Sequence, residues 1–232
     1  MDYYNLAEKQ SREEKIPEAL VSYDRAIEMD PQFFSAHLAR GRTHFCLGNM
    51  ELALADSINA LKLKPGSIEA LKLKAGALDN SGRYREALKI YNQLIALNPD
   101  KPLLFNERAG VNLNLKRPRS AVMDYSQAIK LRPDYGEAYM NRGIIYTYVE
   151  FYPRAIDDFT VIIERNLPTG DSPLSYVLYN RAVAYLRMDN KTLARRDFEW
   201  VINRYPQCNE ADMAQEWLNK IDSREIGQNT DR

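Results

Sequence analysis

The chain has 232 residues and no excess charge, because 32 lysines and arginines balance 32 aspartates and glutamates. This balance argues against a strongly basic nucleic-acid-binding surface and against long-range attraction to an anionic membrane. No apolar run approaches the ~18 residues that a membrane-spanning helix needs, and residues 1–10 lack the basic start and apolar centre of a signal peptide.

Helical signals recur along the chain with a period of 34 residues. Prolines mark this period at Pro31, Pro65, Pro99 and Pro133. Within each period, apolar residues recur at spacings of three and four, which predicts two amphipathic helices joined by a turn. The expected organisation is six repeats at residues 1–33, 34–67, 68–101, 102–135, 136–174 and 175–208, then a closing helix at 209–222 and a flexible tail at 223–232.

The repeats differ in chain order in a few informative ways. The first has a largely polar first helix, as a terminal repeat facing water should. The next two are expected to turn at Gly48 and Gly82, where glycine supplies the positive φ of a chain reversal. In the fourth and fifth, Pro118 and Pro153 are placed to begin second helices. A five-residue insertion within Asn166–Ser175 predicts a bulging loop before the sixth.

A small residue, an aromatic four positions later and then a proline recur in most repeats. Examples are Ala19, Tyr23 and Pro31; Ala87, Tyr91 and Pro99; Ala121, Tyr125 and Pro133; and Ala194, Phe198 and Pro206. This pattern resembles the tetratricopeptide repeat family over residues 1–206. The resemblance implies an all-α fold, a right-handed superhelical solenoid of antiparallel helix pairs, with the first helix of each repeat on the concave face.

Arginine and aspartate occur together at two positions that are sixteen residues apart within a repeat. The pairs are Arg40 with Asp56, Arg108 with Asp124, Arg142 with Asp158, and Arg181 with Asp197. In the third repeat Lys74 replaces the arginine and Ile90 replaces the aspartate. We interpret the pairs as structural ion pairs that fix the register of the two helices, rather than as ligand-binding groups.

The concave face is the candidate binding site that the resemblance implies. In the last three repeats its positions are apolar, aromatic and rich in asparagine, whose amides could hold the backbone of an extended peptide. The candidate peptide-binding residues are Asn106, Met140, Asn141, Ile144, Tyr148, Tyr176, Tyr179, Asn180, Val183 and Arg187. The lysine, asparagine and arginine set of the family's carboxylate-clamp type has no match in any window.

No catalytic, metal or cofactor motif stands out in the sequence. His37 and His44 share one helix face, but other repeats carry apolar or aromatic residues at both positions, so we interpret them as packing residues. Cys46 and Cys208 lie far apart, which favours a reducing, cytoplasmic location and no disulfide.

These observations favour a non-enzymatic adaptor that binds a protein or peptide partner in the concave groove, without cofactor, nucleic acid or membrane. One alternative is a homo-oligomeric assembly component, in which the groove or the inserted loop docks onto another copy. A second alternative is the targeting module of a larger enzyme. The closing helix or the tail could also fill the groove.

Overall fold

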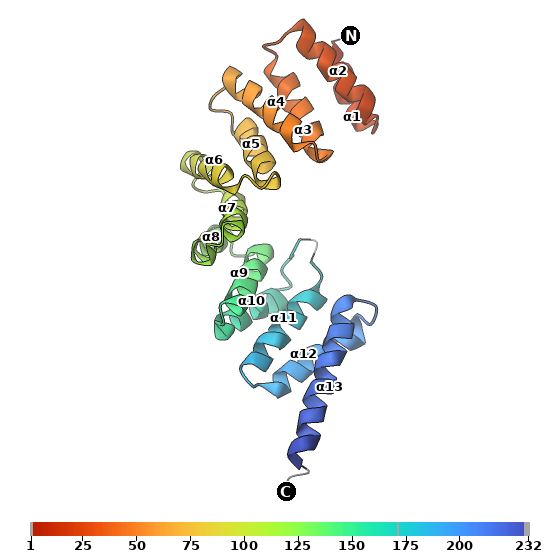
Figure 1. Cartoon of the computed structure of the whole chain (residues 1–232), viewed down its shortest axis with the longest axis vertical. Coiled ribbons are helices and arrows are strands. Elements are labelled where there is room, and N and C mark those ends of the chain that lie inside the picture. The colour runs from red at the N-terminus through yellow and green to blue at the C-terminus, as the bar shows by residue number, and fades with distance from the viewer. Residues whose placement is uncertain (1, 171, 230–232) are drawn as a thin grey trace. The chain divides into compact units, whose positions relative to one another are not determined.

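The computed structural model describes residues 2–170 and 172–229, with side chains as far as Ser223. Over these residues the chain forms thirteen helices and no strand, which confirms the all-α prediction (Figure 1). The helices are α1 (Tyr3–Arg12), α2 (Ile16–Met29), α3 (Phe34–Cys46), α4 (Met50–Leu63), α5 (Ile68–Asn80), α6 (Tyr84–Leu97), α7 (Pro102–Asn114), α8 (Pro118–Leu131), α9 (Gly136–Tyr148), α10 (Tyr152–Arg165), α11 (Leu174–Arg187), α12 (Lys191–Arg204) and α13 (Asn209–Asn229).

The helices form two compact units, Met1–Arg117 and Pro118–Arg232. The first unit contains α1 to α7 and the second contains α8 to α13. The division falls between α7 and α8, which are the two helices of the fourth predicted repeat.

Within each unit, first helices of neighbouring repeats form a common layer. In the first unit α3 packs against α5 as well as against its own partner α4. In the second unit α11 contacts α9 and α13 in addition to α12. Over the described part of either unit, no two second helices pack against each other as these first helices do. The candidate binding residues on α9 and α11 therefore belong to one continuous layer of helices.

The turn inside each helix pair is set by one residue in the left-handed conformation. These residues are Glu14 (φ 59°), Gly48 (φ 78°), Gly82 (φ 73°), Lys116 (φ 58°), Glu150 (φ 63°) and Asp189 (φ 57°). They follow the 34-residue period until the insertion. The predicted positive φ at Gly48 and Gly82 is confirmed, and elsewhere a charged residue adopts the same conformation, at a modest steric cost.

Small and aromatic residues fill the space between the helices of each pair. The small residue of the second helix is fully buried in every repeat, at Ala19, Ala53, Ala87, Ala121, Ala155 and Ala194. The aromatic ring one turn later is also buried, as at Phe159 and Phe198. A Cβ on Gly143 would lie 2.8 Å from the Phe159 ring, so this position admits only glycine without a shift of the ring.

The inserted loop leaves α10 at Asn166, whose φ of 49° is left-handed, and it packs against the start of α9. A Cβ added to Gly136 would meet the carbonyl oxygen of Pro168 and the Cβ of Leu167, at 2.8 Å for the latter. Asp171 in this loop lies outside the described residues. The loop is thus packed on its own unit over its described residues.

The closing helix α13 packs against both helices of the sixth repeat, α11 and α12. Ala214, Leu218 and Ile221 are buried there beside Phe198. The helix continues to Asn229, beyond the predicted boundary at Asp222. Residues 223–229 were expected to belong to a flexible tail, but they contain no proline to interrupt the helical backbone. Residues 230–232 of the expected tail lie outside the described residues.

Candidate functional site

Three of the four predicted arginine–aspartate pairs are present, each as two parallel hydrogen bonds. Arg40 donates to Asp56 from Nε at 2.9 Å and from Nη2 at 2.6 Å. Arg142 donates to Asp158 at 2.8 and 2.6 Å. The Asp56 bonds raise the pKa of Arg40 above its ordinary value, whereas burial raises the pKa of Asp158. A planar guanidinium that faces a carboxylate in this way fixes both distance and orientation.

The third pair, Arg181 with Asp197, has the same geometry at 2.7 and 2.9 Å. Arg181 is itself buried, and it lies on α11 opposite Asp197 on α12. The fourth predicted pair, Arg108 with Asp124, has one member in each compact unit and stays a prediction.

Each of these arginines also bonds to the second helix of the preceding repeat, which the sequence interpretation missed. The acceptors are Asp24 for Arg40 (2.6 Å), Asn92 for Arg108 (2.8 Å), Ser126 for Arg142 (2.9 Å) and Thr160 for Arg181 (3.1 Å). All four donors are Nη1. Arg40, Arg142 and Arg181 therefore each join three helices from two repeats, so they also fix how neighbouring repeats stack.

A sequence signal for this third partner was present. The four acceptors follow the 34-residue period, and all four side chains carry an oxygen that can accept a hydrogen bond. In the second repeat the same position holds Ile58, and the following repeat has Lys74 in place of the arginine. The acceptor is thus absent where the arginine is absent.

On α9, the candidate binding residues differ strongly in exposure. Tyr148 is 83% exposed, and Asn141 and Ile144 are half-buried. Met140 is only 6% exposed and belongs to the core cluster around Phe159. The expectation that Met140 lines the surface is corrected, because its side chain points into the packing between helices.

On α11, the candidate residues are mostly half-buried and partly committed to packing. The Tyr179 ring lies 5.7 Å from the Phe198 ring, and its hydroxyl accepts a hydrogen bond from Trp217 Nε1 at 3.2 Å. Asn180 donates its amide to the carbonyl oxygen of Tyr176 at 2.8 Å. The carbonyl group of the Asn180 side chain is then the part that is available to a ligand.

The remaining candidates lie in different surroundings. Val183 is half-buried and Arg187 is exposed, both on α11. Asn106 lies on α7 in the other compact unit and is only 7% exposed. Asn106 is therefore largely buried, contrary to the expectation that it lines a binding surface.

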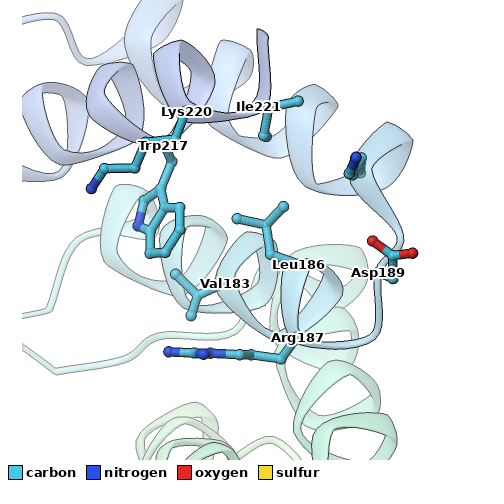
Figure 2. A pocket seen from close by; sticks show the side chains of 8 residues that line it. Val183, Leu186, Arg187, Asp189, Trp217, Lys220 and Ile221 are labelled. Atoms are coloured by element: carbon cyan, nitrogen blue, oxygen red, sulfur yellow. The ribbon is translucent and has the colours of Figure 1, made fainter. Parts of the chain in front are cut away.

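A pocket of about 210 Å³ lies between α11 and α13. Its lining residues are Val183, Leu186, Arg187, Asp189, Lys191, Trp217, Lys220 and Ile221. Figure 2 shows Trp217 projecting from α13 toward Val183 and Leu186 on α11. The pocket has an apolar floor and a charged rim. No pattern in the sequence indicated that Lys191 and Lys220 would line the same pocket as Trp217.

The two histidines lie within the first unit. The His37 Nδ1 lies 3.4 Å from Asp56 Oδ1, and its Nε2 lies 3.1 Å from the carbonyl oxygen of Pro31. The Nδ1 of His44 is buried and has no hydrogen-bond partner among the described residues, and burial lowers the pKa of this imidazole. Among the described residues, no three His, Cys, Asp or Glu side chains converge as a metal ion requires.

None of the described helices combines the length and the apolar character needed to cross a bilayer.

Known sequences and structures agree on the fold. Sequence models of the tetratricopeptide repeat match residues 4–68, 73–125 and 176–207. No curated protein sequence matches the chain significantly.

Solved structures similar to the chain include three that span most of its length. PilW, described as a widely conserved type IV pilus biogenesis factor, has a TM-score of 0.74 at 16% identity, over 92% of this chain and 96% of its own. PilF of Pseudomonas aeruginosa has a TM-score of 0.71 at 19% identity, over 94% and 96%. YrrB, described as having an unusual peptide-binding site, has a TM-score of 0.66 at 20% identity, over 84% and 97%. At these identities the likeness concerns the fold alone. With more than half of its residues matched by the repeat models, the chain belongs to the tetratricopeptide repeat family.

Proposed function

We propose that the chain is a non-enzymatic adaptor that binds a segment of another protein on the first-helix layer of its second unit. This layer, formed by α9, α11 and α13, is the concave face of that unit in our proposal. Its main support is the group of partly exposed apolar and aromatic side chains on α9 and α11. Proteins seldom leave such side chains bare without a partner.

The polar groups of this face suit an extended peptide. The Asn141 amide makes no hydrogen bond within the described residues, and the Asn180 side-chain carbonyl is not used by its own helix. An amide can donate to and accept from a peptide backbone at the same time. Aromatic rings beside it, such as Tyr148 and Tyr176, can pack against the peptide side chains. The peptide-binding site in the description of YrrB is consistent with this use of the fold.

The closing helix does not conflict with this proposal. Its extensive contacts are with α11 and α12. Ile144 on α9 and Tyr176 on α11 pack beside one core cluster, whereas Trp217 of α13 packs beside another. Within the described part of the second unit, the face near Ile144 and Tyr148 is thus formed by α9 and α11.

A peptide selection tests the proposal. Peptides of ~12 residues are selected from a random displayed library against the full chain, and their affinities are measured by calorimetry. The double variant Asn141→Ala with Tyr148→Ala removes one free amide and one highly exposed ring without opening the core. We expect the selected peptides to bind it about tenfold more weakly or worse.

The matched control is Met123→Ala with Asn203→Ala, which removes one apolar and one asparagine side chain from exposed positions on second helices. Affinity should stay within about twofold of the unchanged chain. Tyr179 is avoided because its ring and hydroxyl hold Phe198 and Trp217 in place. Equal losses in the two double variants, or no loss in either, would contradict the proposal.

A further inference from the structure

The pocket between α11 and α13 carries an imbalance of charge. Arg187, Lys191 and Lys220 line it, and Asp189 is the single carboxylate among its lining residues. Among the described side chains, no carboxylate forms an ion pair with any of the three cations. The carboxylate of Asp222, also on α13, is engaged by Arg195 at 2.5 Å. The rim therefore presents a net positive charge that the described side chains do not neutralise.

The floor of the same pocket is apolar. Val183 and Leu186 of α11 face Trp217 of α13, and Ile221 is buried beside them (Figure 2). The Nζ of Lys220 lies 4.9 Å from the centre of the Trp217 ring. In the view of Figure 2, Lys220 and Arg187 lie on opposite sides of this ring. Positive charge therefore borders an apolar surface that a single ligand could contact together with the rim.

The size of the pocket limits the ligand. Pockets for drug-sized small molecules measure roughly 300–1,000 Å³, whereas this one measures about 210 Å³. It suits one large apolar side chain rather than a whole cofactor. The cationic side chains at its rim can then be contacted only by ligand groups that flank that apolar side chain.

From this combination we infer that the pocket binds an internal acidic segment of a protein partner, with one leucine or phenylalanine on the floor and flanking aspartate or glutamate side chains on Arg187, Lys191 and Lys220. The inference rests on the proposed function and specifies the chemistry of the partner at the end of the binding face. Charge-assisted hydrogen bonds to carboxylates are stronger than neutral ones. Complementary charge also selects against basic partners.

The test uses the fluorescence emission of Trp217 to report binding in the pocket. The chain has two tryptophans, so Trp200→Phe leaves Trp217 as the only one, with a ring kept beside Tyr205. The probe is the peptide Glu-Asp-Glu-Leu-Phe-Glu-Asp-Glu, acetylated and amidated so that its terminal charges are removed. Titration should change the Trp217 emission and saturate. Two further peptides, one with lysines for the acidic residues and one with serines for Leu-Phe, should each bind about tenfold more weakly or worse.

Charge-reversed variants distinguish an effect of the pocket residues on binding from an effect of the net charge of the chain. Lys191→Glu with Lys220→Glu changes the rim, whereas Arg165→Glu with Arg204→Glu makes the same change of net charge at exposed sites on α10 and α12. We expect the first pair of substitutions to lower the affinity for the acidic peptide about tenfold or more. The second pair should change this affinity by less than about twofold. Circular dichroism and thermal unfolding check that all variants are folded.

Several results would overturn the inference. Equal binding of the lysine peptide, equal losses in the two charge-reversed variants, or equally tight binding of a dT12 oligonucleotide would show that the pocket does not recognise an acidic apolar segment. The outcome is separable from the proposed function. Library-selected peptides that depend on Asn141 and Tyr148 would keep that function even if the acidic peptide does not bind.

Discussion

Arg181 and Asp197 form a two-point ion pair in which both side chains are buried, with exposed fractions of 8% and 4%. The Nε and Nη2 groups of Arg181 each donate to a different carboxylate oxygen. Removing two charges from water is costly, and their attraction offsets this cost only when the geometry is good. The pair is therefore better explained as a device that specifies how α11 lies on α12 than as a large net source of stability.

This explanation predicts non-additive effects of substitution. Arg181→Met leaves the Asp197 carboxylate buried without its partner and should lower the free energy of unfolding by about 3–5 kcal/mol. The double variant Arg181→Met with Asp197→Leu leaves no buried charge and should recover most of that loss. Urea denaturation of the three proteins measures both effects. A double variant that is less stable than the single variant would contradict a register role.

The hydrogen bond from Arg181 to Thr160 on the preceding repeat predicts a smaller and local effect of substitution. Thr160→Val keeps the shape of the side chain but removes the oxygen that accepts from Arg181 Nη1. We expect a loss of about 0.5–1.5 kcal/mol in the free energy of unfolding, as for a single hydrogen bond. Thr192→Val, at an exposed position of α12, is the matched control and should change stability by less than about 0.5 kcal/mol. Similar values for both would mean that the link between repeats contributes nothing.

The sequence was sufficient for most of the fold because the period repeats the same local constraints. Alanine at the small position, a ring one turn later and a left-handed residue in each turn specify a helix pair that needs no distant information. The end of α13 could not be found in this way. Past Asp222 the apolar pattern ends, yet the backbone continues as a helix to Asn229.

The candidate site was less predictable because exposure depends on the neighbouring helix. Counting along the repeat placed Met140 and Tyr148 on one face, but Met140 is buried against the next repeat and Tyr148 is 83% exposed. The cationic pocket combines Arg187 from one element with Lys220 from another that lies outside the 34-residue alignment. No period in the sequence relates these two residues, so only the packing of α13 brings them together.

His44 predicts a specific pH dependence. Burial lowers the pKa of its imidazole below the usual ~6.5, so the unfolded chain binds a proton at this residue before the folded chain does. Its contribution to stability is present above that value and is lost as the pH falls through the lowered pKa of the folded state. His44→Leu places in α3 the residue that the next repeat carries at Leu78. The difference in melting temperature, variant minus unchanged chain, should increase between pH ~7.5 and pH ~5.5. A difference that is constant over this range would contradict the burial of a neutral imidazole.

Two glycines in first helices predict opposite effects of the same substitution. A Cβ on Gly136 would meet the carbonyl oxygen of Pro168. Because that atom belongs to backbone, Gly136→Ala has to displace the inserted loop, and we expect it to lower the free energy of unfolding by about 1–3 kcal/mol. Gly110 lies inside α7, and apart from the adjacent residues and backbone of its own helix, no heavy atom of the described residues lies within 4 Å of the added Cβ. Gly110→Ala should instead stabilise the chain by about 0.5–1 kcal/mol, since alanine restricts the unfolded backbone more than glycine does.

Urea denaturation compares the two variants, and limited proteolysis reports on the loop. Faster cleavage within residues 166–170 is expected for Gly136→Ala and not for Gly110→Ala, because only the first substitution displaces Leu167 and Pro168. The two readouts are independent of each other. If Gly136→Ala were as stable as the unchanged chain and cleaved at the same rate, the loop would not be packed on the start of α9. In that case the insertion would be free to move away from the repeat that precedes it.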